Sequence, residues 1–394
     1  MRFPSRVAAV AAALLIAAFT LVGVGTASAE PSPVGTAHRA VKVCATAPGL
    51  AACHSWVRTD ITPLAAPAGY GPADLQSAYN LASASASRGA GQTIAVVDAF
   101  DDPTAEADLA VYRSTFGLPP CTTANGCFRK VDQNGGTSYP RKNAGWALEV
   151  SLDLDMVSAI CPNCNILLVE ANTNSFANLG AAVNRAAAMG ANAISNSYGS
   201  SSDVSDADLG SFYNHPGIAV TASSGDSGFG VSYPASSHFV TAVGGTTLRS
   251  GGGTRGWTET VWSGAGSGCS SLNAALSGAA SFNTGCPGRA VADVSAVADP
   301  NTGVAVYDTT RYQGRSGWFV VGGTSASAPI IAAVYGLAGN TGAIDNNYPY
   351  ANAGSFFDVT SGSNGNCSPS QLCVARVGWD GPTGLGTPNG YTGF

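Results

Sequence analysis

Short apolar runs alternate with longer amphipathic stretches along the chain after residue 90. Four apolar runs, rich in aliphatic residues, predict buried strands: residues 93–100, 164–171, 192–199 and 217–225. Three stretches between them follow a helical pattern: residues 101–117, 143–160 and 176–191. This alternation predicts an α/β fold, with a doubly wound, mostly parallel sheet and helices on both of its faces. Folds of this kind carry their chemistry in loops at the carboxyl ends of the strands.

A further apolar run lies near the start of the chain. Arg2 and Arg6 precede eighteen residues, "VAAVAAALLIAAFTLVGV", and Ala27-Ser28-Ala29 follows them. This is the pattern of a secretory signal with a small-residue cleavage site. A membrane anchor is the alternative, because the run is about long enough to span a bilayer. We expect residues 1–29 to be a signal peptide, 30–70 a short prosegment or N-terminal extension, and 71–394 the folded domain.

The composition restricts the classes of partner. Hydrophobic residues make up 45 % of the chain and charged residues only 11 %, with a net charge of −6 and no basic run. Nucleic-acid binding leaves a basic footprint, which is missing here. We therefore expect a secreted, extracellular monomer that binds neither nucleic acid nor, after removal of the signal, a membrane.

Ten cysteines in an exported chain indicate disulfides. The simplest pairing is between near neighbours: Cys44/Cys53, Cys121/Cys127, Cys161/Cys164, Cys269/Cys286 and Cys367/Cys373. The "CPNC" couple, Cys161 and Cys164, also fits a redox or zinc motif. No second ligand pair at zinc spacing and no thioredoxin-like context accompanies it, so we predict a structural disulfide.

Ser325 lies in "GGTSASAP", where a glycine-rich run changes into a predicted helix, with Pro329 expected in the first helical turn. A serine in this place is either a nucleophile or a helix cap. A nucleophilic serine needs a neighbour that accepts its proton, usually a histidine. The chain has four histidines, two upstream of the predicted domain and two in connections before strands: His38, His54, His215 and His238. None has the sequence context of a catalytic base.

Two carboxylates offer an alternative base. Glu149 and Asp153, in "ALEVSLDLD", are four residues apart and therefore lie on one face of a helix. A proton shared between them would raise one pKa and make Glu149 a base oriented by Asp153. A solvated acidic helix face is the alternative. Asp155 points elsewhere, and we expect it to be solvent-facing or structural.

Three motifs together resemble the sedolisins, the serine-carboxyl peptidases of the subtilisin-like superfamily. "GGTSASAP" resembles the nucleophile segment, and "GIAVTASSGDSG" with "YPASSHFVTAVGGTTL" resembles the oxyanion-loop strand and the elements after it. Asp226 stands where subtilisins carry asparagine, and Glu149 with Asp153 replaces the histidine helix. The resemblance runs from about Asp74 to the C-terminus. It implies that the predicted domain, 71–394, is a sedolisin-like peptidase domain with a subtilisin-like fold.

The resemblance implies a role for each of four residues. Ser325 would be the nucleophile, Glu149 its general base and acid, and Asp153 the residue that orients Glu149. Asp226 would donate from a protonated carboxyl to the oxyanion, because a carboxylic acid donates only while protonated. The implied activity is hydrolysis of protein or peptide substrates through an acyl-enzyme, with an acidic pH optimum.

The C-terminal region resembles the calcium site of the same family. Asp358 and Asp380 would supply carboxylates, and the main-chain oxygens of Val359, Arg376 and Gly378 would complete the oxygen shell that Ca²⁺ prefers. We therefore expect one structural Ca²⁺ ion and no other cofactor.

Two positions depart from this pattern or lack a partner in it. Tyr198 stands where the family commonly has tryptophan. Asp98 occupies the strand end where subtilisins place the aspartate of their triad, and without a histidine to orient we expect it to be structural or to support the site indirectly. Family members usually carry a large inhibitory prodomain, whereas about forty residues follow the predicted signal here.

Two other functions compete with the peptidase. A non-catalytic secreted binding protein on a peptidase fold fits the short prosegment, although all four chemical residues are retained. A subtilisin-type enzyme active at neutral pH would require a suitable histidine.

Overall fold

The computed structural model describes residues 1–2, 38–61 and 66–394, and from residue 38 onward these belong to one compact unit. Apart from its first two residues, the predicted signal peptide lies outside the described residues and stays a prediction. Within the described ranges, no helix is long and apolar enough to cross a membrane.

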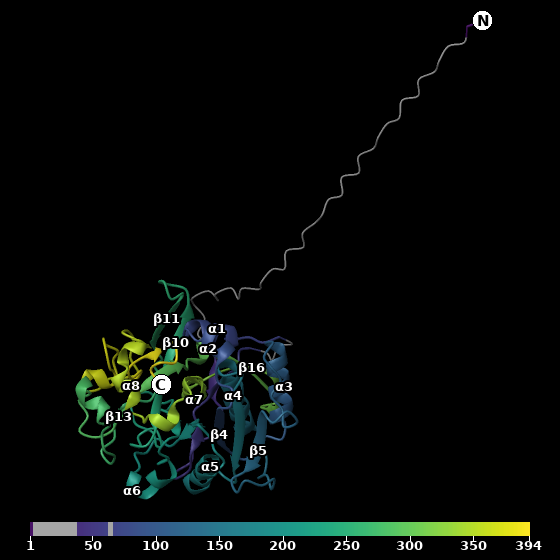
Figure 1. Cartoon of the computed structure of the whole chain (residues 1–394). Coiled ribbons are helices and arrows are strands. Elements are labelled where there is room, and N and C mark those ends of the chain that lie inside the picture. Colours follow the sequence, from purple (N-terminus) through teal and green to yellow (C-terminus); the bar gives the residue numbers. More distant parts are fainter. Residues whose placement is uncertain (3–37, 62–65) are drawn as a thin grey trace. The chain divides into compact units, whose positions relative to one another are not determined.

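A mostly parallel sheet forms the centre of the unit (Figure 1). Its strands lie in the order β11 (Trp257–Val261), β10 (Thr241–Ser250), β9 (Ala219–Ser223), β7 (Ala193–Asn196), β4 (Thr93–Ala99), β6 (Asn165–Ala171) and β5 (Phe128–Asp132), and β14 (Val294–Val297) also pairs with β10. Only the pairing of β10 with β11 is antiparallel among these described strands. The predicted α/β fold, doubly wound around a mostly parallel sheet, is confirmed.

The helices pack on this sheet and on one another. They are α1 (Pro72–Ala78), α2 (Ala82–Ser87), α3 (Ala105–Thr115), α4 (Ala144–Ile160), α5 (Phe176–Ala188), α6 (Asp206–Leu209), α7 (Thr324–Ala338) and α8 (Tyr348–Ala351). Helices α4 and α7 pack against each other and against β4, while α5 packs against β4, β6 and β7. Both α4 and α7 are apolar on nearly every side, which is the pattern of a helix enclosed by protein.

A second sheet, which the sequence did not predict, is antiparallel and has the order β1-β3-β16-β15. Strands β15 (Val304–Tyr312) and β16 (Arg315–Gly322) form a hairpin that leads directly into α7. Strands β1 (Ala40–Lys42) and β3 (Trp56–Arg58) come from the N-terminal extension and lengthen this hairpin sheet. The described parts of the extension, residues 38–61 and 66–70, therefore belong to the compact unit. Whether the chain is processed ahead of residue 71 stays a prediction.

Three short antiparallel pairs complete the strands. They are β2 (Ala52–Cys53) with β8 (Tyr198–Gly199), β12 (Gly268–Cys269) with β13 (Ala290–Val291), and β17 (Phe356–Phe357) with β18 (Thr387–Pro388).

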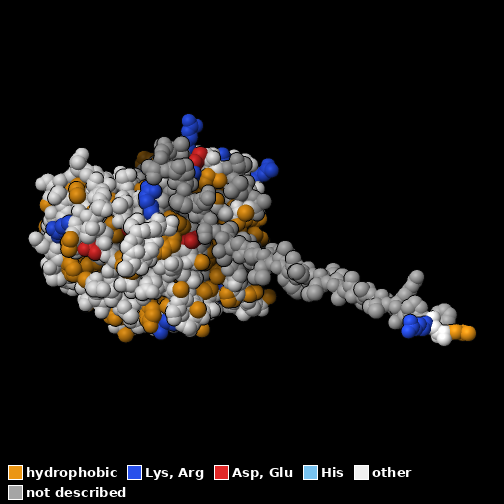
Figure 2. All heavy atoms as spheres, turned by 90° about the horizontal axis from the view of Figure 1, so that it is seen from above, with side chains coloured by type: hydrophobic (Ala, Val, Ile, Leu, Met, Phe, Trp, Pro, Cys, Tyr) orange, Lys and Arg blue, Asp and Glu red, His pale blue; other side chains and the backbone are white. Residues whose placement is uncertain are grey.

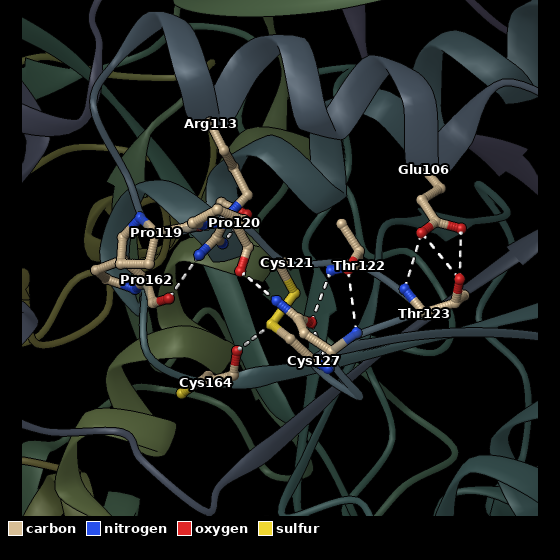
Figure 3. Close-up of a disulfide and its surroundings, with 12 residues drawn as sticks. Glu106, Arg113, Pro119, Pro120, Cys121, Thr122, Thr123, Cys127, Pro162 and Cys164 are labelled. Atoms are coloured by element: carbon tan, nitrogen blue, oxygen red, sulfur yellow. Dashed lines mark hydrogen bonds between the residues drawn. A yellow bond between two sulfur atoms is a disulfide. The ribbon is translucent and has the colours of Figure 1, made fainter.

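All five predicted disulfides are present. Each closes a short loop, as the near-neighbour pairing requires. Figure 3 shows Cys121–Cys127, which closes the connection between α3 and β5. Arg113 fixes the same region, because its guanidinium donates to the carbonyl oxygens of Pro119 and Pro162.

Charged side chains are scattered on the face shown in Figure 2, between larger areas of uncharged atoms. Many carboxyl groups lie inside the protein instead. Buried acidic residues include Asp98, Asp102, Asp108, Glu149, Asp153, Asp155, Glu170, Asp226, Asp293, Asp308 and Asp380. Burial of so many acids is expensive unless they are protonated or paired, which makes their surroundings informative about function.

Candidate active site

Ser325 lies in the first turn of α7 and is fully buried. Its hydroxyl donates to the main-chain oxygen of Ser197 at 3.0 Å. The preceding Gly323 has a φ of +102°, and a Cβ there would lie 2.1 Å from the oxygen of His54 and 2.6 Å from Oδ2 of Asp226. Only glycine fits this position, and it lets the backbone of His54 and Ser55 and the side chain of Asp226 approach the start of the helix.

Pro329 corrects one sequence prediction. It lies inside α7, one turn beyond Ser325, and not in the first turn. Proline lacks the N–H that would bond to the carbonyl four residues earlier, so the carbonyl of Ser325 is left free of its helical partner. The Ser197 hydroxyl donates to this carbonyl at 3.3 Å. Ser197 therefore contacts both the side chain and the main chain of Ser325.

Helix α4 carries Glu149 and Asp153 into the interior, and both side chains are fully buried. Asn143 starts the helix by accepting from the backbone N–H groups of two residues in its first turn. The alternative of a solvated acidic face is therefore wrong. Asp155 is also buried and accepts from the N–H of Tyr307 at 3.0 Å, so of its two predicted positions the structural one is correct.

Asp98, at the end of β4, joins the two carboxyls of α4 in a buried cluster. Burial raises the pKa of Asp98 to about 8. Burial, and then the charge of Asp98, raise the pKa values of Glu149 and Asp153 well above their usual range. None of the six carboxyl oxygens has a hydrogen-bond partner among the described residues. Three buried acids this close cannot all be ionised, so they hold protons jointly.

Glu149 also faces the start of α7. The hydroxyls of Ser325 and Ser55 favour the charged form of Glu149 and so oppose the rise in its pKa. No direct hydrogen bond joins Glu149 to Ser325, because the Ser325 hydroxyl is turned to Ser197. A rotation about the Cα–Cβ bond of Ser325 is the movement that would direct its hydroxyl elsewhere.

Asp226 approaches Ser325 from the loop after β9. Its Oδ1 accepts from the N–H of Thr324 at 2.8 Å and from the Thr324 hydroxyl at 2.7 Å. Its Oδ2 is buried and has no hydrogen-bond partner among the described residues. Burial raises the pKa of Asp226 to about 7, against the opposing effects of Thr324 and Lys42. Below that pH the carboxyl holds a proton, and Oδ2 is the oxygen free to donate it.

None of the four histidine rings contacts the Ser325 hydroxyl, in agreement with the sequence, which offered no histidine as a catalytic base. The rings of His215 and His238 contact main-chain oxygens, and His38 contacts Asp60. His54 differs from the expectation that it lies upstream of the domain. Its main-chain oxygen accepts from the N–H of Ser325 at 2.9 Å, and its ring contacts the hydroxyl of Ser223 at 2.8 Å.

The structure thus brings together Ser325, Glu149, Asp153 and Asp226, all four of the predicted catalytic residues. Their individual roles remain predictions. The sequence analysis expected Asp98 to be structural or to support the site indirectly, and its effect on the pKa values of Glu149 and Asp153 agrees with the second of these. Ser197, Thr324, Ser55 and His54 were missed because their sequence contexts carry no recognisable chemistry.

The predicted calcium ligands gather around one turn near the C-terminus. Asp358 accepts from the N–H of Gly378 at 2.9 Å, and Asp380 accepts from the N–H of Arg376 at 3.2 Å. Among the described residues, the main-chain oxygens of Val359, Arg376 and Gly378 accept no hydrogen bond. Two carboxylates and three free carbonyls are a donor set that fits Ca²⁺. Clusters of three or more His, Cys, Asp or Glu side chains suited to a metal are absent from the described ranges.

The chain belongs to the subtilase family, whose family model matches residues 136–348. Kumamolisin of Bacillus sp. (strain MN-32) is 30% identical over 369 residues, which are 83% of this chain and 63% of kumamolisin. Sedolisin of Pseudomonas sp. (strain 101) is 31% identical over 180 residues, which are 40% of this chain and 29% of that protein. These relatives confirm the predicted membership of the sedolisin group.

A solved structure gives the same fold. The structure of Pseudomonas sedolisin, a serine-carboxyl proteinase complexed with two molecules of pseudo-iodotyrostatin, superposes with a TM-score of 0.67 at 24% identity. The match covers 82% of this chain and 96% of that one. The chain spans less than two thirds of the length of the curated relatives, about 63% in the case of kumamolisin.

Proposed function

We propose that this protein is a secreted serine-carboxyl peptidase that hydrolyses peptide bonds in proteins or peptides. The main support is the position of Ser325 at the start of α7, where it faces the buried carboxyls of Glu149 and Asp226. No histidine side chain contacts its hydroxyl. The names of relatives such as kumamolisin, sedolisin and "Tripeptidyl-peptidase 1" of Dictyostelium discoideum support a peptidase. The disulfides suit an exported, oxidising setting.

The chemistry divides among the four predicted residues. Ser325 Oγ attacks the carbonyl carbon of the scissile bond while Glu149 takes its proton. Glu149 acts as the base in its ionised form, which the hydroxyls of Ser325 and Ser55 favour, while Asp153 and Asp98 share the remaining protons of the buried cluster. The developing oxyanion accepts from the N–H of Ser325 and from the proton on Asp226. Glu149 then protonates the leaving amine, and water releases the acyl group by the same steps in reverse.

This division of roles makes hydrolysis depend on an acidic pH. The pKa of Asp226 is about 7, so its carboxyl can donate only below that pH. Loss of one oxyanion donor typically lowers the rate by about 100-fold to 1000-fold. We therefore propose an acidic pH optimum, with an alkaline limb set by Asp226.

Hydrolysis of a denatured protein substrate between about pH 3 and pH 8 tests the function. Ser325→Ala should abolish it. Ser327→Ala is the matched control, because Ser327 lies on the same helix and donates only to main-chain oxygens of residues 296 and 297. Equal hydrolysis by the parent protein and Ser325→Ala would remove Ser325 as the nucleophile. No hydrolysis by the parent at any pH, before or after acid treatment, would favour the non-catalytic binding protein.

We also propose that one Ca²⁺ ion stabilises the C-terminal turn. The carboxyls of Asp358 and Asp380 and the carbonyls of Val359, Arg376 and Gly378 would hold it. The fit of this donor set supports the proposal, since Ca²⁺ prefers shells of carboxylate and carbonyl oxygens. The ion would supply stability and would take no part in the reaction.

A further inference from the structure

Ser197 directly follows strand β7 and lies between the nucleophile and the buried carboxyls. In the parallel pairing of β4 with β7, Val96 lies opposite Ser195. The same register, continued by two residues, brings Ser197 level with Asp98 on one face of the sheet. Helix α4 packs on β4, and α7 packs on β7. Ser197 therefore lies where the two helices of the active centre meet the sheet.

Two hydrogen bonds join Ser197 to Ser325. The main-chain oxygen of Ser197 accepts from the Ser325 hydroxyl at 3.0 Å, and the Ser197 hydroxyl donates to the Ser325 carbonyl at 3.3 Å. Both residues are fully buried, so that bulk water does not compete for these contacts. Ser197 thus holds both the side chain and the main chain of the nucleophile.

The second of these bonds replaces one that the helix lacks. In a regular helix the carbonyl of Ser325 accepts from the N–H of the residue four positions later, but that residue is Pro329, which has no N–H. A buried carbonyl that is left without a donor destabilises the folded protein. The Ser197 hydroxyl supplies the missing donor from the sheet. The first turn of α7 is therefore tied to the end of β7 as well as to its own helix.

The same hydroxyl also acts on the carboxyl of Asp153. It favours the charged form of Asp153 and so opposes the rise that burial gives to the pKa of this group. Neither carboxyl oxygen of Asp153 is bonded elsewhere among the described residues, so a proton on Asp153 is available to Ser197. A hydroxyl donates one hydrogen and accepts through its lone pairs. Ser197 can therefore accept from a protonated Asp153 while it donates to the carbonyl of Ser325.

We propose that Ser197 is a positioning residue that ties the first turn of the nucleophile helix to the carboxyl of Asp153. The proposal rests on the peptidase function proposed above. The Ser197 hydroxyl replaces the donor that Pro329 lacks and so holds the main chain of Ser325. It neither takes a proton from the nucleophile nor contacts the substrate. Its effect is to direct the Cα–Cβ bond of Ser325, so that one rotation turns the nucleophile hydroxyl from Ser197 toward Glu149.

Proton transfer from Ser325 is sensitive to such support. The proposed base, Glu149, stands on α4, whereas Ser325 stands on α7, so their alignment depends on how the two helices are fixed to the sheet. A misplacement of about 1 Å can lower the rate of a reaction step about 100-fold. Loss of the Ser197 hydroxyl should therefore lower kcat. KM should stay close to the parental value, because this hydroxyl does not contact the substrate.

The first test separates the hydroxyl of Ser197 from its shape. Ser197→Ala should lower kcat by about 10-fold to 100-fold and leave KM within about twofold. Ser197→Thr keeps a hydroxyl and should be about tenfold more active than Ser197→Val, which has a similar shape without one. Ser195→Ala is the control, because Ser195 follows the same face of β7 and its buried hydroxyl has no partner among the described residues. Parental kcat in Ser197→Ala, or equal losses in the two alanine variants, would overturn the proposal.

The second test restores the missing helical donor. Pro329→Ala supplies an N–H for the carbonyl of Ser325, so adding it to Ser197→Ala should recover kcat by about threefold or more. Ser197→Ala should also cost less in Asp153→Asn than in the parent, because residues that act through one chain of contacts are not additive. Absence of any recovery by Pro329→Ala would refute the role of Ser197 at the carbonyl. Full additivity with Asp153→Asn would refute its link to the carboxyl.

A third measurement needs no peptidase activity and so separates this proposal from the proposed function. Ser325→Ala retains the carbonyl at position 325, and its thermal unfolding at about pH 4 reports the same contact. In this background Ser197→Ala should lower the unfolding midpoint by on the order of 2 °C, and by less once Pro329→Ala is also present. The same loss with and without Pro329→Ala would overturn the proposal. Absence of hydrolysis in the parent would instead refute the peptidase function and leave this midpoint comparison to decide the role of Ser197.

Discussion

Thr324 donates twice to one oxygen of Asp226, through its N–H and its hydroxyl, and the other oxygen of Asp226 has no hydrogen-bond partner within the part of the chain that the structure describes. The carboxyl is thereby fixed, and its free oxygen is directed to the start of α7. The two hydrogen bonds favour the charged carboxylate, while burial favours the neutral acid and prevails. Asp226 can therefore donate a hydrogen bond beside Ser325 while its carboxyl is protonated, and loses this ability when it ionises.

Asp226→Asn tests this donor. An amide donates at every pH, so the variant should retain activity above pH 7, where the parent loses it as Asp226 ionises at about 7. Asp226→Ala should lower kcat by about 100-fold or more at the optimum, because no donor remains. Full pH profiles of kcat/KM, measured on protein that has been treated with acid, test this expectation. Identical alkaline limbs for the parent and Asp226→Asn would exclude Asp226 as the titrating group.

Asp98→Asn tests the buried carboxyl cluster. The charge of Asp98 raises the pKa of Glu149, so its removal should lower that pKa. Glu149 would then act as a base in stronger acid, and the acid limb of the kcat/KM profile should move down by on the order of one pH unit. Asp102→Asn is the control, because Asp102 is also buried but acts on other groups. An acid limb that stays in place or moves up would contradict the coupling.

Stability should fall as the pH rises from about 4 to 8. Asp98 and Asp226 have folded-state pKa values of about 8 and 7, above their ordinary 3.8, so the folded protein holds protons that the unfolded chain releases. The contribution of these two groups to the free energy of unfolding is complete below pH 3.8. It is lost as the pH rises towards their folded-state pKa values, at about 1.4 kcal/mol per pH unit for each group. Thermal unfolding of Ser325→Ala, which cannot digest itself, measures it. A midpoint that stays constant or rises over this range would contradict the buried acids, and Asp226→Asn should flatten the slope.

Removal of Ca²⁺ should destabilise the protein. A ligand that binds only the folded state at about 100 times its Kd contributes about 2.7 kcal/mol. A chelator should therefore lower the unfolding midpoint of the parent but change that of Asp380→Asn little. Asp208→Asn, which removes an exposed carboxyl, is the matched control and should keep the full response. If the parent shows no response to chelator or to added Ca²⁺, the turn at residues 376–380 does not bind the ion.

The features that sequence predicted well are local ones. Period and spacing predicted four strands of the central sheet, β4, β6, β7 and β9, and the helices α3, α4 and α5, while near-neighbour spacing predicted the disulfides. The placement of Glu149 and Asp153 on one helical face followed from their separation of four. That face proved to be buried because α4 is apolar on nearly all sides, which its sequence already indicated.

The features that sequence missed depend on distant partners. Strands β1 and β3 are three residues each, too short to show a period, and β3 pairs with β16 more than 250 residues away. His54 contributes to the site through its main-chain oxygen, which no side-chain pattern records. Asp98 acts on Glu149 only because β4 and α4 pack together.

The central claim is that carboxyls, and Glu149 above all, activate Ser325. The test mixes acid-treated protein with a peptide substrate and quenches the reaction within one turnover. Mass spectrometry then shows whether an acyl group forms on Ser325. We predict the acyl-enzyme in the parent and in Asp155→Asn, a buried carboxyl of the same helix whose substitute can still accept from Tyr307. In Glu149→Gln its formation should slow by about 100-fold or more. Acylation of Ser325 at the parental rate in Glu149→Gln would contradict the account.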